Sequence, residues 1–275
     1  MYLYTRQRNR RTSWIRVLFL LALIGAGIYI YVLIRQDRIE SPFEPTPVPT
    51  RSAASYEAEA QALYLQGDLD GAIAQYEYAL TLEPQNVLYH IPLVRLLTLQ
   101  GDVVEAIQRG EYATELAPQN ARAWAVLGMA YDWNGDVAES IDACLLAIDL
   151  DPIYAEAYAY LAEAYADAWR WDAAMDTIDT ALQLDERNVD VLRNYGYVLE
   201  VQGYYYDAIE AYQRALEIHP NLAYIHVTLG QNYRAVGDYE AAANSFQRVI
   251  ELEPNNAEAY DQLAWTYYGM GDYDR

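Results

Sequence analysis

The chain has 275 residues, 53% hydrophobic and 21% charged, so it is long enough to bury a sizeable core and too apolar to be disordered throughout. Its 40 acidic residues outnumber 18 basic ones, all arginine, and a net charge of −22 makes nucleic acid an unsuitable ligand. The lack of lysine excludes P-loop and Schiff-base chemistry, and the single cysteine, Cys144, excludes an intrachain disulfide and a four-thiolate metal site.

The first predicted element is a transmembrane anchor. A basic segment, 1–16, precedes an uncharged apolar run at 17–34, which as a helix would span ~27 Å of the ~30 Å hydrocarbon core. Trp14 precedes the run, and Tyr29 and Tyr31 lie near its other end, as in an interfacial aromatic belt. A cleaved signal peptide is the main alternative, and a buried soluble helix is another. The run exceeds the usual ~7–15 apolar residues of a signal peptide, and no small-residue cleavage site follows it.

Arginines around this run predict its orientation. Five precede it, and only Arg35 and Arg38 follow closely; the five are Arg6, Arg8, Arg10, Arg11 and Arg16. The positive-inside rule then places the N-terminus in the cytoplasm and the rest of the chain outside it. We therefore expect a single-pass protein of the cell membrane with an extracytoplasmic domain.

The next segment, 35–52, is a proline-rich linker. Four prolines alternate with other residues: Pro42, Pro45, Pro47 and Pro49. Such a pattern favours an extended polyproline II segment, in which ten residues reach ~30 Å. The segment is interpreted as a stalk or as a disordered connector, and a proline-motif ligand for a partner is a further reading.

From residue 53 the sequence repeats with a period of 34 residues. Two independent markers keep this period: the glycines Gly67, Gly101, Gly135, Gly203, Gly237 and Gly271, and the prolines Pro84, Pro118, Pro152, Pro220 and Pro254. Trp169 and Glu186 stand where one glycine and one proline are missing. Small residues recur at fixed helical positions, and Asp after the glycine or Asn before the next unit is suited to cap a helix.

This pattern resembles the tetratricopeptide repeat (TPR) family. The family signature is met by Trp124, Leu127, Gly128, Tyr131, Cys144, Ala147 and Pro152, with Ser140 in place of alanine. Six full repeats are predicted at 53–86, 87–120, 121–154, 155–188, 189–222 and 223–256, with a partial seventh at 257–275. The resemblance implies an all-α fold: a right-handed α-solenoid of antiparallel helix pairs, whose first helices line a concave groove, preceded by one transmembrane helix.

Departures from the pattern carry predictions of their own. Pro92 and Gly110 are expected to make the second repeat the least protected internal one. Trp169 lies in a turn and is expected to be exposed, either as loose consensus or as an edge contact for a partner, whereas Trp171 occupies a core position. His90, His226 and Cys144 stand at packing positions rather than in a site.

No catalytic, cofactor or metal motif is present in the sequence, so the protein is not predicted to be an enzyme. Mapping the inward positions of TPR first helices gives an aromatic and acidic groove that suits a basic or neutral protein or peptide. The basic clamp that TPR proteins use for acidic chaperone tails is absent. The predicted partner-binding residues are Tyr64, Arg95, Trp133, Tyr160, Glu163, Tyr197, Tyr224, Arg234, Trp265 and Tyr268.

These features predict a membrane-anchored scaffold for protein–protein interactions, working in assembly or recruitment at a bacterial cell envelope. The alternatives are the regulatory region of a longer enzyme, such as a transferase, and a sorting or import receptor on an organelle membrane. The last first helix, 257–270, is followed by no second helix, so we expect that the reading frame continues or that this face self-associates.

Overall fold

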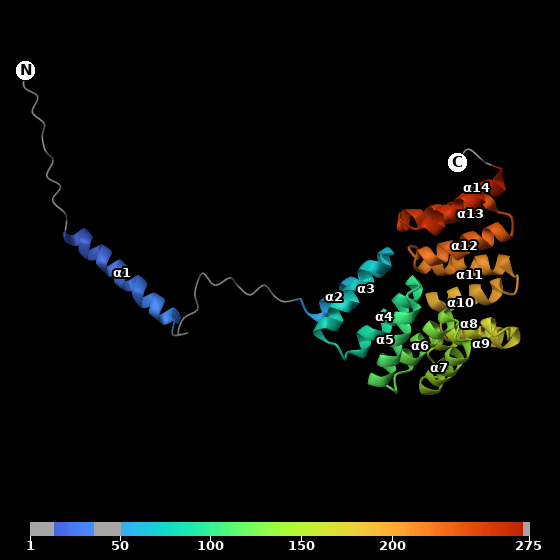
Figure 1. Ribbon diagram of the computed structural model, residues 1–275, viewed down its shortest axis with the longest axis horizontal. Coiled ribbons are helices and arrows are strands. Elements are labelled where there is room, and N and C mark those ends of the chain that lie inside the picture. The colour runs from blue at the N-terminus through green and yellow to red at the C-terminus, as the bar shows by residue number, and fades with distance from the viewer. Residues whose placement is uncertain (1–13, 36–50, 272–275) are drawn as a thin grey trace, which may run out of the picture. The chain divides into compact units, whose positions relative to one another are not determined.

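A computed structural model describes residues 14–35 and 51–271 (Figure 1). Within these ranges the chain forms helices and no strand, which confirms the all-α prediction. The helices are α1 (Trp14–Arg35), α2 (Ala53–Gln66), α3 (Leu69–Leu82), α4 (Val87–Gln100), α5 (Val103–Leu116), α6 (Ala121–Asn134), α7 (Val137–Leu150), α8 (Ala155–Asp167), α9 (Trp171–Leu184), α10 (Val189–Glu200), α11 (Tyr205–Ile218), α12 (Ala223–Ala235), α13 (Tyr239–Leu252) and α14 (Ala257–Met270).

Helix α1 is a unit by itself. Its segment Trp14–Leu33 has a mean hydropathy of 2.2, and by length and composition it is suited to cross a membrane. The helix begins three residues before the predicted span and ends one residue after it. Residues 1–13 of the predicted basic segment and 36–50 of the predicted linker lie outside the described residues.

The second unit, from residue 51 onward, alternates first and second helices along the chain. The repeats α2–α3, α4–α5, α6–α7, α8–α9, α10–α11 and α12–α13 are helix pairs, and α14 is a further first helix (Figure 1). The small residues predicted to lie between paired helices are fully buried: Ala72, Ala106, Ser140, Ala174, Ala208 and Ala242. These positions let the two helices of each pair pack closely.

Most of the predicted caps are confirmed. The side chains of Asn86, Asn120, Asn188 and Asn256 accept hydrogen bonds from backbone N–H groups in the first turn of the helix that follows each of them. Asp68 and Asp238 do the same for second helices. The prediction is wrong for Asp102 and Asp136, which hold the N-cap position but whose side chains make no capping hydrogen bond. Asp272 lies outside the described residues.

A recurring hydrogen bond ties five of the seven first helices in the described array to the turn before them. The side chain at the fourth position of the repeat bonds the proline carbonyl six residues earlier at 2.9–3.2 Å; the pairs are His90–Pro84, Trp124–Pro118, Tyr158–Pro152, His226–Pro220 and Tyr260–Pro254. The two histidines therefore serve as packing residues, and burial lowers the pKa of each.

The fifth repeat replaces this bond. It has Leu192 at the fourth position, which has no side-chain donor, so the carbonyl oxygen of Glu186, at the proline position, receives no bond from the first helix. Instead the Arg214 guanidinium donates to the Glu186 carbonyl oxygen at 3.3 Å. A side chain of the second helix thus satisfies the acceptor that a first-helix side chain satisfies elsewhere.

Cys144 is fully buried, as expected. A Cβ built at Gly128 would lie 2.4 Å from its sulfur atom, so the glycine of the family signature makes room for the side chain of the second helix. Burial raises the pKa of the Cys144 thiol, with Asp132 adding to the effect, so the thiol is neutral and packs as a small apolar group.

Candidate functional site

All ten predicted partner-binding residues lie on first helices, and these helices form the inner face of the array. The structure joins most of them in two polar clusters that are satisfied within the chain. We call them the closing cluster and the central cluster. Only the α14 pair, Trp265 and Tyr268, is largely exposed among the ten.

The closing cluster connects helices that are far apart in sequence. Arg95 of α4 forms a two-pronged ion pair with Asp190 of α10: Nε donates to Oδ2 at 2.8 Å and Nη2 to Oδ1 at 2.6 Å. The hydroxyl of Tyr160 on α8 donates to Asp190 Oδ2 at 3.0 Å, and Arg95 Nη2 also donates to the Tyr64 hydroxyl of α2 at 2.9 Å. Four helices thus meet at one charged pair.

This ion pair is largely removed from solvent, with side-chain exposures of 18% for Arg95 and 11% for Asp190. Burial by itself would raise the pKa of Asp190, but the charge and hydrogen bonds of Arg95 hold it below its usual value. Burial opposes the charge on Arg95 as well, and the carboxylate of Asp190 more than offsets this and raises the pKa of the guanidinium. Both groups are therefore ionised at neutral pH.

Further contacts close the array between its first repeat and the loop before its sixth. Asn221 Nδ2 donates to the Leu65 carbonyl oxygen at 3.0 Å, and the rings of Tyr64 and His219 lie 4.7 Å apart. Gly67 has a φ of +89°, and a Cβ there would lie 2.4 Å from the Asn221 carbonyl oxygen. Figure 1 shows the α2–α3 turn beside the start of α12. The array therefore curves back until its first repeat touches the loop between its fifth and sixth repeats.

The central cluster lies on α6, α8 and α10. Arg193 donates to both carboxylate oxygens of Glu163 at 2.6 and 2.5 Å, and the side chains are only 7% and 6% exposed. Trp133 Nε1 donates to Glu163 Oε1 at 3.1 Å, and the guanidinium carbon of Arg193 lies 5.5 Å from the centre of the Trp133 ring. The Tyr197 hydroxyl donates to Asp167 Oδ1. These side chains hold one another in place.

Asp132 is a buried carboxyl group beside this cluster. Burial raises its pKa to about 9, and the nearby carboxylates of Glu163 and Asp167 contribute to the rise. Its Oδ1 has no hydrogen-bond partner among the described residues. Asp132 is consequently protonated at neutral pH, which leaves the central cluster with less negative charge than its sequence indicates.

Two predicted residues on α12 are partly covered. Burial raises the pKa of the Tyr224 hydroxyl well above its usual value, and the neighbouring Tyr64 hydroxyl adds to this. The guanidinium carbon of Arg234 lies 5.8 Å from the ring centre of Phe246. Neither residue joins the ion pairs of the two clusters.

The inner face of α14 is open. Trp265 is 59% exposed and Tyr268 is 62% exposed, and their rings pack edge to face at 5.8 Å. Glu258 and Asp261 of the same helix are exposed and acidic. Chemically this surface offers aromatic rings beside negative charge, which suits a basic or aromatic segment of a protein.

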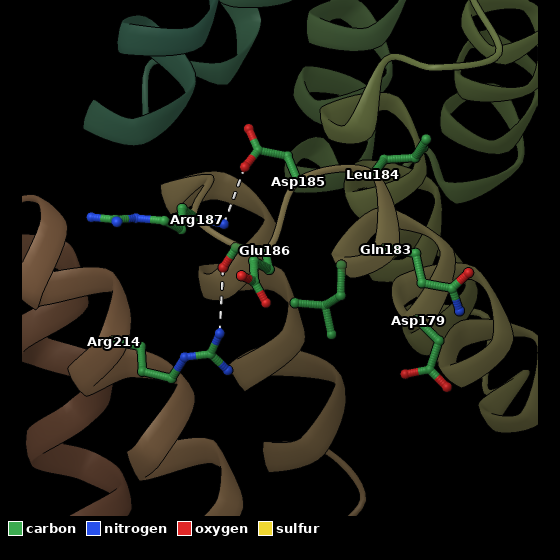
Figure 2. A pocket seen from close by; sticks show the side chains of 8 residues that line it. Asp179, Gln183, Leu184, Asp185, Glu186, Arg187 and Arg214 are labelled. Carbon is green, nitrogen blue, oxygen red and sulfur yellow. Dashed lines mark hydrogen bonds between the residues drawn. The ribbon is translucent and has the colours of Figure 1, made fainter.

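A shallow cleft lies outside the inner face, between the end of α9 and α11. It is lined by Asp179, Leu182, Gln183, Leu184, Asp185, Glu186, Arg187 and Arg214. Figure 2 shows Arg214 directed at Glu186, while the Arg187 side chain points away from it. The Asp185 carboxylate accepts from the Arg187 backbone N–H at 3.1 Å. These hydrogen bonds serve the repeat-five turn, and no group of metal-ligating side chains occurs among the residues that the structure describes.

Some of these contacts could have been predicted from the spacing of residues in the sequence, and others could not. Four inner-face hydrogen bonds join residues 30 positions apart: Trp133–Glu163, Glu163–Arg193, Tyr160–Asp190 and Asp167–Tyr197. Complementary residues at that spacing could have predicted contacts between neighbouring repeats. The ion pair of Arg95 and Asp190 spans 95 positions and the Asn221 contact spans 156, and no spacing rule indicates either.

The antiparallel helix pairs stack, and their first helices line one face. By its fold the chain is therefore an α-solenoid, a class of repeat protein. Models of the tetratricopeptide repeat match residues 57–121, 100–155, 187–254 and 245–275. The chain belongs to the tetratricopeptide repeat family, whose repeats form scaffolds for protein–protein interaction.

Two solved structures with TM-scores above 0.5 support the same fold. The crystal structure of the APC/C hetero-tetramer Cut9–Hcn1 matches with a TM-score of 0.56 and 18% identity over 78% of this chain and 43% of that chain. A thermophilic TPR protein of Thermus thermophilus, TTC0263, matches with a TM-score of 0.51 and 17% identity over 79% and 100%. The crystal structure of MamA gives a TM-score of 0.41 and 26% identity over 62% and 93%. No curated protein matches the chain.

Proposed function

We propose that this protein is a membrane-anchored scaffold that holds a basic or neutral segment of a partner protein on the inner face of its last repeats. The observation that carries the proposal is the exposed pair of Trp265 and Tyr268 on α14, at a part of the inner face that takes no part in the two clusters. Large aromatic side chains are the usual anchors of protein interfaces, and the acidic residues beside them favour a partner of opposite charge.

The anchor is proposed from α1 and its flanking arginines. The helix has the length and apolar character of a membrane span, and the five-to-two arginine bias favours repeats outside the cytoplasm. Protease added to intact cells, or to spheroplasts if there is an outer membrane, should then digest the repeats. Digestion only after lysis would contradict this topology and with it the proposed role at the cell envelope.

The binding surface is tested with a photo-crosslinking residue in place of Trp265. In membranes of the native host we expect a discrete crosslinked product containing a second protein. The same residue in place of Tyr78, which is exposed on α3, is the matched control and should give none. Crosslinking of the α14 surface to a second copy of this chain would assign the surface to self-association instead. Equal products from both positions would contradict a specific site.

A further inference from the structure

A second exposed aromatic surface lies at two turns, away from α14. The turn between α8 and α9 carries Trp169, which is 78% exposed, and Arg170. The turn between α10 and α11 carries Tyr204, followed by Tyr206, which is 74% exposed. We call Trp169, Arg170, Tyr204 and Tyr206 the aromatic turn patch. Nothing in the inner-face clusters involves these four side chains.

The two turns are neighbours in the structure. They belong to consecutive repeats, and helices α8 to α11 follow one another in the array (Figure 1). Trp171, just after the first turn, and Val201, just before the second, pack against the same hydrophobic cluster. The rings of Trp169 and Trp171 lie 5.5 Å apart in an edge-to-face arrangement. The exposed aromatic side chains of both turns are therefore presented along one edge.

The first of these turns departs from the backbone of the others. At the other turns within helix pairs, Gly203 of the second turn included, a glycine takes a left-handed conformation, whereas Trp169 has a φ of +61° and is the one non-glycine residue with positive φ among those described. Arg170 and Tyr204 stand at N-cap positions that Asp holds in the other second helices. Backbone strain at a non-glycine residue costs stability, and such strain is concentrated where a protein binds something.

We propose that the aromatic turn patch binds a basic segment of a partner protein, through stacking of arginine or lysine side chains on Trp169 and Tyr206. Charge supports this partner, because 37 acidic residues and 11 arginines follow residue 50. Exposed Asp172 and Asp207 begin the two second helices beside the patch. The edge already holds one such contact, since the guanidinium carbon of Arg170 lies 4.2 Å from the ring centre of Tyr165. Cations are attracted to the faces of Trp and Tyr.

The test measures binding of a fluorescent deca-arginine peptide to the full chain in phosphatidylcholine nanodiscs at near-physiological salt. The variant W169G/R170D restores the glycine–aspartate turn of the other repeats. It makes the surface more acidic, so charge alone would strengthen binding of the basic peptide. If the aromatic side chains carry the site, the affinity should instead fall about tenfold, while the thermal midpoint stays equal or rises.

A control variant separates this site from the rest of the surface. Tyr78→Ala removes an exposed tyrosine of the first repeat and should bind the peptide as the unchanged chain does. Unchanged affinity in W169G/R170D would overturn the inference, and so would an equal loss in Tyr78→Ala. Binding in detergent micelles but not in nanodiscs would show that the bilayer covers the patch, which also overturns it.

Discussion

Asp132 shows how burial of a single carboxyl group sets a pH dependence. Its pKa in the folded chain is about 9, against 3.8 for the exposed group. Between these values the folded state binds one more proton than the unfolded state, so this residue makes the free energy of unfolding fall as the pH rises toward 9. Above that pH its contribution stays at its most unfavourable level.

We therefore predict that Asp132→Asn stabilises the repeat array, and that the gain grows from pH 4 to pH 9. At pH 8 the free energy of unfolding should rise by at least ~2 kcal/mol, because one pKa unit corresponds to about 1.4 kcal/mol. Urea unfolding of the full chain in detergent, followed by circular dichroism at several pH values, measures it. Asp142→Asn, on the exposed side of α7, is the control and should show no such trend. A pH-independent gain would contradict the assignment.

At the scale of the helix, the fifth repeat depends on a replacement contact. Arg214 supplies the hydrogen bond to the Glu186 carbonyl that a first-helix side chain supplies to proline elsewhere. Arg214→Met should therefore destabilise the array by ~1 kcal/mol, the usual net value of one hydrogen bond. Arg187→Met, at an exposed neighbouring arginine, should have a smaller effect. Equal midpoints of urea unfolding for both variants would argue against a stabilising role of the Arg214 bond to the Glu186 carbonyl.

The second repeat is the internal unit that we expect to open most easily. Pro92 removes one backbone donor from α4, although the helix continues through it from Val87 to Gln100. Gly110 is buried, and a Cβ there would lie 3.0 Å from Leu127 Cδ1, so the next repeat fills the space left by the missing side chain. Hydrogen exchange of 87–120 should be faster than that of 121–154. Equal protection of the two repeats would show that this packing offsets the two unfavourable residues.

For the whole molecule, closure of the array depends on the ion pair of Arg95 and Asp190. Arg95→Met leaves a carboxylate in a largely desolvated position, and loss of one partner from such a pair costs ~3–5 kcal/mol. We predict a destabilisation of that order, with faster hydrogen exchange at 61–70 and 219–224 together, because those segments meet only when the array is closed. Asp190→Asn added to Arg95→Met should recover part of the loss, since the amide can still accept from Tyr160.

The matched control is Arg109→Met. Arg109 pairs with Glu105 at 2.9 Å and Glu77 at 3.6 Å on the surface, where ion pairs contribute ~0–1 kcal/mol. An Arg95→Met variant as stable as this control, with both segments still protected, would show that other contacts suffice to hold the first repeat against the loop before the sixth.

The repeat fold could be predicted from sequence because its determinants are local and periodic. Gly135, Ala147 and Pro152 each recur at 34-residue steps, and each has a local role in a turn or a helix contact. The positional rule assigned Glu163 and Trp133 to first helices, where the structure has them. What these side chains do there depends on superhelical curvature. This curvature is the sum of small rotations between repeats over four units, and no local sequence pattern indicates that sum. The pairing of Arg95 with Asp190 was therefore not predicted.

The closing contact also constrains how such a gene can change in length. Repeat arrays gain and lose whole units, and most solenoids tolerate this because each unit touches only its neighbours. Here α4 and α10 are three repeats apart. A unit inserted or deleted between them would move Arg95 out of contact with Asp190. Units added after Asn221 would leave that pair untouched. Among homologues we therefore expect a constant repeat number between α2 and α12, and variation in number only beyond it.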